Sequence, residues 1–418
     1  MRRLVAHRDA RVLLLGESLS LFGDRAMYLA LGIWVKQLTG SNAAAGLVFF
    51  ALALPFLAAP LGGLLVDRVR RRPLLIGVEI ALAACLLSLF FVHGRSQLWL
   101  IYAVTACYGA AGVVFTSARS ALLTVMLPGE VLADANAALQ TLSEAMRLVA
   151  PLAGAGLFVA VGGAGVAAID AATFLVSALC IGLLRVVEPR PAPAEHHWIR
   201  ELGAGLAHIR VTPMLRRIVL CTAGALLVVG FAETLIFAVV DQGLHRPPSF
   251  LGILLSFQGI GAIVGGLTAA PLLRRVGDAR LVGLGLALFA IGDAFLVAHS
   301  LAVVLVGIVI AGAGLPWAIV AWGTAIQLRS PPHLQGRVYS SADMAVSLPQ
   351  TVSLALGAAL STVVDYRVLV LVMAGTILAF AAPLARTPRE EEHGRAGGLA
   401  TGRSSPRGSS PGAAPADS

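Results

Sequence analysis

The sequence predicts an all-α membrane protein in which twelve transmembrane helices form two pseudo-symmetric halves of six. Composition gives the first reason: 58% of the 418 residues are hydrophobic and 13% are charged, a balance that would give a soluble protein far too much exposed apolar surface. The second reason is the regular alternation of long apolar runs with short segments rich in arginine. A helix needs roughly 20 apolar residues to cross the hydrocarbon layer, and the runs are of that length.

The apolar runs divide into two sets of six, separated by a polar segment. In chain order, the predicted spans are 12–36, 43–66, 74–93, 98–126, 136–161, 164–186, 216–241, 249–273, 280–298, 301–328, 337–362 and 366–385. They define a cytoplasmic N-terminus at 1–11, an N-terminal half at 12–186, a linker at 187–215, a C-terminal half at 216–386 and a tail at 387–418. The linker has a helical stretch from Trp198 to Arg210, whereas the tail is rich in Gly, Ser, Pro and Ala and is predicted to be disordered.

Arginines predict the orientation in the membrane. The chain has 31 basic residues, a formal net charge of +9, and a single lysine, Lys36. Arginines gather before the first span, in the loop after the second span, in the linker and in the corresponding loops of the C-terminal half. The opposite side carries only Lys36, Arg95, Arg246 and Arg367. Positively charged loops stay in the cytoplasm, so both termini are predicted to be cytoplasmic in a cell (inner or plasma) membrane. We interpret the clusters as topology signals and contacts with anionic lipids, not as a nucleic-acid site.

Several kinds of chemistry have no signature in the chain. The four cysteines lie inside apolar runs without CxxC spacing, so neither a disulfide framework nor a metal site is indicated. The sequence has no Walker loop and no catalytic-triad pattern. We therefore predict no enzymatic activity, no cofactor and no metal. The expected partners are a small-molecule substrate, protons and the lipid bilayer, and the protein is expected to be a monomer.

The two halves resemble each other, and short motifs make the whole chain similar to major facilitator transporters. Residues 126–128 before the fifth span resemble residues 330–332 before the eleventh. The loop after the second span has glycine, aspartate and a basic cluster at the spacing of that superfamily: Gly63, Asp67, Arg68, Arg70, Arg71 and Arg72. Arg70 stands where the superfamily usually has glycine. The resemblance implies the major facilitator fold, with a substrate site near the midplane between the halves.

Further motifs are similar to the branch of macrolide-efflux-like permeases and siderophore exporters. They are residues 23–24, 38–41, 121–128, 150–154, 201–210 and 335–338. The superfamily resemblance also implies a cytoplasmic latch in which Asp67 accepts hydrogen bonds from the start of the eleventh helix, with the arginines tethered to lipid. A plain topology signal is the alternative. Arg119, late in the fourth span, is expected to pair with Asp67 or Glu130 as part of this gate.

The first span carries a polar stripe. Glu17, Ser20, Asp24 and Tyr28 recur at a spacing that places them on one helical face. Charges at membrane depth are costly, and they usually face a cavity or a partner. We interpret the stripe as a cavity wall with Asp24 and Glu17 as proton-coupling candidates and Tyr28 as a substrate-binding candidate. The alternative is that Asp24 pairs with an arginine and locks helices together.

The fifth and eleventh spans carry matching stripes. The candidates for substrate binding are Gln140 and Arg147 in the fifth span and Ser347 and Gln350 in the eleventh. Those for proton coupling are Glu144 and Asp343. Arg147 could bind an anionic group, pair with Asp24, or pair with Glu144 on its own helix.

The other carboxylates inside the predicted spans differ in how strongly they indicate a functional role. Glu233 is a further proton-coupling candidate or an extracellular gate contact. Glu79 and Asp293 belong to helices that are peripheral in this fold, so we expect them to be structural or to lie near an interface. Asp170 is expected near a membrane boundary and to carry little functional weight.

The predicted function is multidrug-type efflux: export of a hydrophobic or amphiphilic small molecule, drug or macrolide-like, in exchange for protons by alternating access. A siderophore or other natural-product exporter is the near alternative. A non-transporting receptor or scaffold on the same fold stays open, because fold does not fix function.

Overall fold

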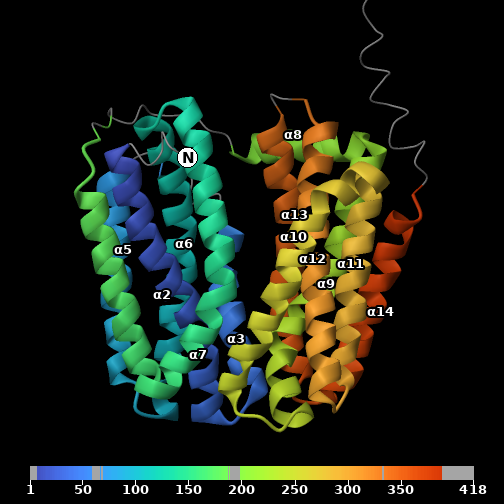
Figure 1. Cartoon of the computed structure of the whole chain (residues 1–418), viewed down its shortest axis with the longest axis horizontal. Helices are drawn as coiled ribbons and strands as arrows, with labels where there is room; N and C mark the ends of the chain where they lie inside the picture. Colours follow the sequence, from blue (N-terminus) through green and yellow to red (C-terminus); the bar gives the residue numbers. More distant parts are fainter. Residues whose placement is uncertain are drawn as a thin grey trace, which may run out of the picture.

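The computed structural model describes residues 7–58, 66, 69–186, 188, 198–331 and 334–387. Within these ranges all regular secondary structure is helical, and there is no strand. The helices form two bundles that lie side by side with their axes roughly parallel (Figure 1). The predicted disordered tail beyond Thr387 and residues 189–197 of the linker lie outside the described residues.

The first bundle contains the described parts of the first six predicted spans. Its helices are α2 (Arg8–Thr39), α3 (Asn42–Ala53), η1 (Leu54–Ala58), α5 (Arg71–Leu87), η2 (Ser88–Phe91), η3 (Arg95–Gln97), α6 (Leu98–Met126) and α7 (Gly129–Gly182). The element α7 contains the fifth and sixth predicted spans as two helical segments. It turns at Gly162, whose φ of 70° is a left-handed conformation that glycine adopts without steric cost.

The second bundle begins with the linker helix and contains the last six predicted spans. Its helices are α8 (Trp198–Val211), α9 (Pro213–Ala238), η4 (Val239–Gly243), η5 (Pro248–Phe250), α10 (Leu251–Val276), α11 (Asp278–Ala294), η6 (Phe295–Val297), α12 (Leu301–Arg329), α13 (Gln335–Leu360) and α14 (Tyr366–Ala385). The linker helix α8 packs against α13 and α9 at one end of this bundle.

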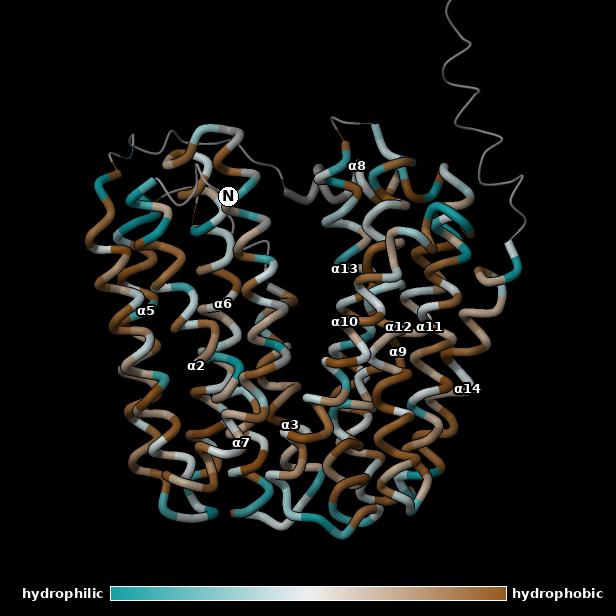
Figure 2. The backbone as a smooth tube through the Cα atoms, in the orientation of Figure 1, coloured by the Kyte–Doolittle hydropathy of each residue, from teal (hydrophilic) through white to brown (hydrophobic). Residues whose placement is uncertain are grey.

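Eight helices in the described part of the chain are long and apolar enough to cross a membrane. Figure 2 shows hydrophobic residues along the lengths of the helices and hydrophilic residues gathered at both ends of the molecule. The helices α2 and α13 have 32 and 26 residues but are not among the eight. Both carry the polar stripes predicted from the sequence. Their polarity therefore points to a position inside the protein, away from lipid.

Small residues allow the helices within each half to approach closely. A Cβ atom at Gly154 of α7 would lie 2.6 Å from the Cα of Ala26 on α2. In the second half, a Cβ at Gly292 of α11 would lie 2.4 Å from the carbonyl oxygen of Gly307 on α12. Only glycine permits such backbone contacts, which is how membrane helices commonly pack. These crossings fix which faces of α2 and α11 point inward.

The two halves meet at the end of the molecule opposite the N-terminus (Figure 1). There α3 packs against α9 and α13, and α7 packs against α10. The backbone of Gly46 lies against Thr234, and that of Gly252 lies against Ala155. Lys36 Nζ, near the end of α2, forms an ion pair of 2.7 Å with Asp241 of the other half. The molecule is therefore closed at this end by packing and by charge.

Candidate functional site

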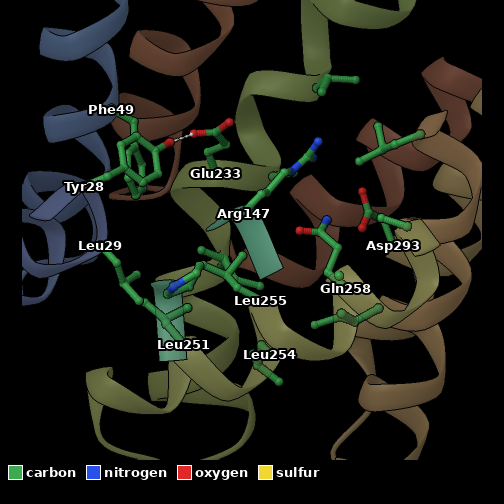
Figure 3. Close-up of a pocket in the computed structure, with 18 of the residues that line it drawn as sticks. Tyr28, Leu29, Phe49, Arg147, Glu233, Leu251, Leu254, Leu255, Gln258 and Asp293 are labelled. Atoms are coloured by element: carbon green, nitrogen blue, oxygen red, sulfur yellow. Dashed lines mark hydrogen bonds between the residues drawn. The ribbon is translucent and has the colours of Figure 1, made fainter. Parts of the chain in front are cut away.

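A cavity of about 400 Å³ lies between the two halves. Its walls come from α2, α3 and α7 of the first half and from α9, α10, α11, η6, α12 and α13 of the second. Most of the lining is aliphatic, which is typical of small-molecule sites, and a few polar side chains interrupt it. The polar lining residues are Arg25, Tyr28, Arg147, Glu233, Gln258, Asp293 and Gln350. Figure 3 shows Gln258 next to Asp293, the hydrogen-bonded Tyr28 and Glu233 further away, and Arg147 between these two pairs.

The charges of the cavity are divided between the halves. Both arginines, Arg25 and Arg147, come from the first half, whereas both carboxylates, Glu233 and Asp293, come from the second. A ligand in the cavity would therefore meet basic groups on one side and acidic groups on the other.

A hydrogen bond joins the halves at the cavity wall. The hydroxyl of Tyr28 on α2 donates to Glu233 Oε2 on α9 over 2.6 Å (Figure 3). The Tyr28 ring packs on Phe49 with 4.8 Å between centroids, which holds its hydroxyl in place. The positive charge of Arg147 acts on both members of this pair. Separating the halves at this end requires the bond to break.

Asp293 differs from what the sequence led us to expect. On a helix expected at the periphery, we predicted a structural role or a position near an interface, but Asp293 lines the cavity. Its side chain is buried, at 5% exposure, and Oδ2 has no hydrogen-bond partner among the described residues. The helix α11 lies close to α12 through Gly292, and this packing turns the next residue inward. The available signal was a lone carboxylate in an otherwise apolar run, which indicates function by default.

The polar stripe of α2 is only partly a cavity wall. Of its four members, Tyr28 lines the cavity, whereas Glu17, Ser20 and Asp24 do not. Glu17 is buried and forms a 2.9 Å ion pair with Arg119 of α6. This pair lies inside the first half, so the described partner of Arg119 is not the gate residue that we expected.

Asp24 belongs to a cluster that sequence reasoning missed. The hydroxyl of Tyr108 on α6 donates to Asp24 Oδ1 and also lies 3.1 Å from Asp170 Oδ2 on α7. Asp170 is buried and accepts a further bond from Thr173, so its carboxyl lies inside the first half. A phenol has one proton to donate, so both Tyr108 contacts are hydrogen bonds only when one carboxyl is protonated.

The remaining stripe residues fall in several places. Arg147 and Gln350 line the cavity. Gln140 is exposed on α7, Asp343 is exposed on α13, and Ser347 is half-buried outside the lining. Glu144 belongs to α7, and its side chain lies outside what the structure describes.

The basic loop is described only in part. Gly63, Asp67 and Arg68 lie outside the described residues, so the predicted latch stays a prediction. The backbone N–H groups of Arg71 and Arg72 donate to the Glu188 carboxylate over 2.7 and 2.8 Å. A carboxylate at the N-terminus of a helix is favourable because it meets free N–H groups and the positive end of the helix dipole. The Arg72 side chain also donates to the Ile181 carbonyl, so these arginines tie the start of α5 to the end of α7.

A family model described as the Major Facilitator Superfamily matches residues 13–244 and 218–411. The chain is also similar to an uncharacterized MFS-type transporter, YfiS of Bacillus subtilis, with 25% identity over 366 residues, 84% of this chain and 86% of the relative. It is 22% identical to macrolide efflux protein A of Streptococcus pyogenes over 355 residues, 82% of this chain and 87% of that protein.

Solved structures share the fold at low identity. A bacterial homologue of the iron transporter ferroportin, in an inward-facing state, has a TM-score of 0.68 and 17% identity and covers 91% of this chain and 99% of its own. The peptide transporter PepTSo has a TM-score of 0.73 and 12% identity, covering 91% of this chain and 97% of its own.

Proposed function

Because the chain belongs to the major facilitator superfamily, whose members are membrane transporters and not enzymes, we propose that it exports a hydrophobic or amphiphilic small molecule in exchange for protons. The observation that carries this proposal is the cavity between the halves, with its aliphatic walls and few polar groups. A cavity of about 400 Å³ is in the size range of sites that enclose drug-sized ligands.

Export is favoured over uptake by the relatives. One of them is named a macrolide efflux protein, and the chain aligns with most of its length. A mostly apolar wall also suits an amphiphilic substrate better than a sugar, which would need many hydrogen-bonding groups.

Alternating access gives the contacts between the halves a role. In the predicted orientation, the closed end that contains Lys36 and Asp241 faces the cell exterior, and both termini are cytoplasmic. Opening the cavity outward requires the Lys36–Asp241 ion pair and the Tyr28–Glu233 hydrogen bond to separate. Two rigid halves that rock about a central site perform such a motion in this architecture. Asp67 and its arginines would hold the cytoplasmic side shut in the opposite state.

Proton coupling would use carboxylates that can take up a proton inside the protein. Asp24 is the leading candidate, because the Tyr108 hydroxyl bridges it to Asp170 and one hydroxyl proton cannot satisfy two carboxylates. Glu233 is the second, because its hydrogen bond to Tyr28 crosses the interface that must open. Loading on one side and release on the other would couple the proton to the motion.

The test is proton release from inverted membrane vesicles that contain the protein. A pH-sensitive dye would report proton movement as macrolides, cationic dyes and siderophores are added singly. We expect one class to cause proton movement, and we expect Asp24→Asn to abolish it. Transport of the active compound that survives unchanged in Asp24→Asn would reject Asp24 as the coupling group. A complete lack of response would favour a non-transporting role.

A further inference from the structure

Building on the proposed function, we propose that the substrate is a lipophilic organic monocation and that Asp293 binds its positive charge. The same carboxyl would hold a proton when the cation is absent, so the cation and the proton would exclude each other there. This assigns a binding group in the second half, separate from the Asp24 cluster of the first.

The first step is the isolation of Asp293. It lies on α11, is 5% exposed, and forms no ion pair or hydrogen bond with another described residue. It is nevertheless part of the cavity wall, and Figure 3 shows its carboxylate beside the labelled Gln258. The other acidic group of the cavity, Glu233, already accepts the Tyr28 hydrogen bond. Asp293 is thus the cavity carboxylate that a ligand finds without a protein partner.

The second step is the absence of an opposing charge on the surrounding helices. The charged side chains described on the helices packed against α11 are Arg216, Arg217 and Glu233 on α9, Arg274 and Arg275 on α10, Arg329 on α12 and Arg367 on α14. The arginines lie at helix ends, where Arg329 pairs with Asp278 and Arg367 contacts His299. From the first half, Arg25 and Arg147 line the cavity, and both act on the pair formed by Tyr28 and Glu233.

The third step is energetic. An ionised carboxylate that is buried without a partner costs several kcal/mol, a cost that only a nearby cation or a bound proton removes. The lining residues about one turn before and after Asp293, Phe289 of α11 and Leu296 of η6, offer neither. A ligand with one positive charge supplies the missing partner. Its apolar body would lie against Leu251, Leu254 and Leu255 of α10, which line the same cavity.

Aromatic and amide groups of the cavity also fit an organic cation. Phe289 lines the wall one turn before Asp293, and the face of an aromatic ring attracts a cation. Gln258 offers an amide oxygen in the same part of the cavity (Figure 3). These groups fit a diffuse organic cation better than a metal ion, which would need several oxygen ligands.

The experiment compares two probes of the same shape and opposite charge. Tetraphenylphosphonium and tetraphenylborate would be titrated by calorimetry into the purified full chain, in buffers with different ionisation enthalpies. Because neither probe carries a titratable proton, any proton released comes from the protein. We expect the phosphonium to bind with release of a proton, and we expect Asp293→Asn to weaken it at least about tenfold and to abolish the release.

Glu79→Gln is the matched control. It makes the same chemical change at a buried carboxylate outside the cavity and should bind the phosphonium like the native chain. Stronger binding of tetraphenylborate would overturn the proposal in favour of an anion at the arginines. Equal phosphonium binding by native protein and Asp293→Asn, or no phosphonium binding at all, would overturn it as well.

The outcomes also separate this inference from the proposed function, because binding needs no transport. If phosphonium binding depends on Asp293 but no proton-driven export is seen in vesicles, the proposed export function is rejected and the cation site at Asp293 is supported. If a neutral compound is exported in exchange for protons and phosphonium binding does not depend on Asp293, the export function is supported and the cation site is rejected.

Discussion

The interior of the first half and the cavity wall of the second treat buried carboxylates in opposite ways. Glu17 pairs with Arg119, Glu79 accepts a 2.6 Å bond from Ser177, and Asp24 and Asp170 share the Tyr108 hydroxyl. Asp293 has no such partner among the described residues. A carboxyl with a partner inside its own half can hold helices together or exchange a proton, whereas one without a partner in a cavity is available to a ligand. The comparison separates the two tasks of an exporter, coupling and recognition, between the two halves.

The largest expected effect comes from removing a paired carboxylate of the first half. Glu17→Ala leaves Arg119 without its described partner in the interior of the first half. Removing one member of a buried ion pair typically costs about 3–5 kcal/mol, so the thermal stability of the purified protein should fall strongly. The double variant Glu17→Ala/Arg119→Met should recover much of the loss. A single variant as stable as the native chain would show that the pair contributes nothing.

Replacing the unpartnered Asp293 should change the stability of the protein in the opposite direction. Asp293→Leu replaces a buried, unpartnered carboxyl by an apolar group beside open cavity space. Because that removes an uncompensated polar group, the ligand-free protein should gain stability, by about 1–2 kcal/mol. Thermal unfolding without ligand measures this change. Glu79→Leu is the matched control and should lose stability, because it strands the Ser177 hydroxyl. A loss of stability in Asp293→Leu would mean that the carboxyl has a protein partner after all.

A smaller effect sharpens the role of the Asp24 cluster. Tyr108→Phe removes the one hydroxyl that touches both Asp24 and Asp170. The loss of this hydroxyl should cost about 1 kcal/mol of stability, the net contribution of a typical hydrogen bond. In vesicles the variant should also move fewer protons per substrate. Calorimetric binding of tetraphenylphosphonium should be unchanged, since the cluster does not line the cavity. Weakened cation binding in this variant would contradict the claim that the Asp24 cluster and the Asp293 site are separate.

The smallest expected effect concerns the contact between the halves. Tyr28→Phe removes the hydrogen bond to Glu233 but keeps the ring packed on Phe49. Losing this hydrogen bond should shift the balance toward the outward-open state by about 0.5–1 kcal/mol. Distance distributions between spin labels at the outer ends of α2 and α9 would report the shift. Unchanged distance distributions would show that the Tyr28–Glu233 hydrogen bond does not help to keep this end closed.

The sequence was most informative about the helices. The bounds of α6, Leu98–Met126, coincide with the predicted span, because hydropathy and flanking polar residues define a membrane helix locally. The predicted break between the spans 136–161 and 164–186 is also found, because the chain leaves the helical conformation at Gly162. Arg147 and Gln350 were chosen from stripe spacing, and both line the cavity.

The direction in which each helical face points was much harder to predict. Periodicity showed that Glu17, Asp24 and Tyr28 share one face of α2, but that face meets α6 and α7 along part of its length and the cavity along the rest. Asp293 was undervalued because its helix was expected at the periphery. Its inward position depends on the glycine contacts between α11 and α12, which no local pattern in α11 reveals. Tyr108 was missed because a single tyrosine in an apolar run has no distinguishing spacing.

The central claim is that coupling and recognition use different carboxylates. The most direct test is tetraphenylphosphonium transport in proteoliposomes under an imposed pH gradient, comparing the native chain with Asp24→Asn, Asp293→Asn and the control Glu79→Gln. We predict uphill transport by the native chain and the control, none by Asp293→Asn, and only downhill equilibration by Asp24→Asn, which still binds the cation. Uphill transport by Asp24→Asn at the native rate, or by Asp293→Asn, would contradict the account.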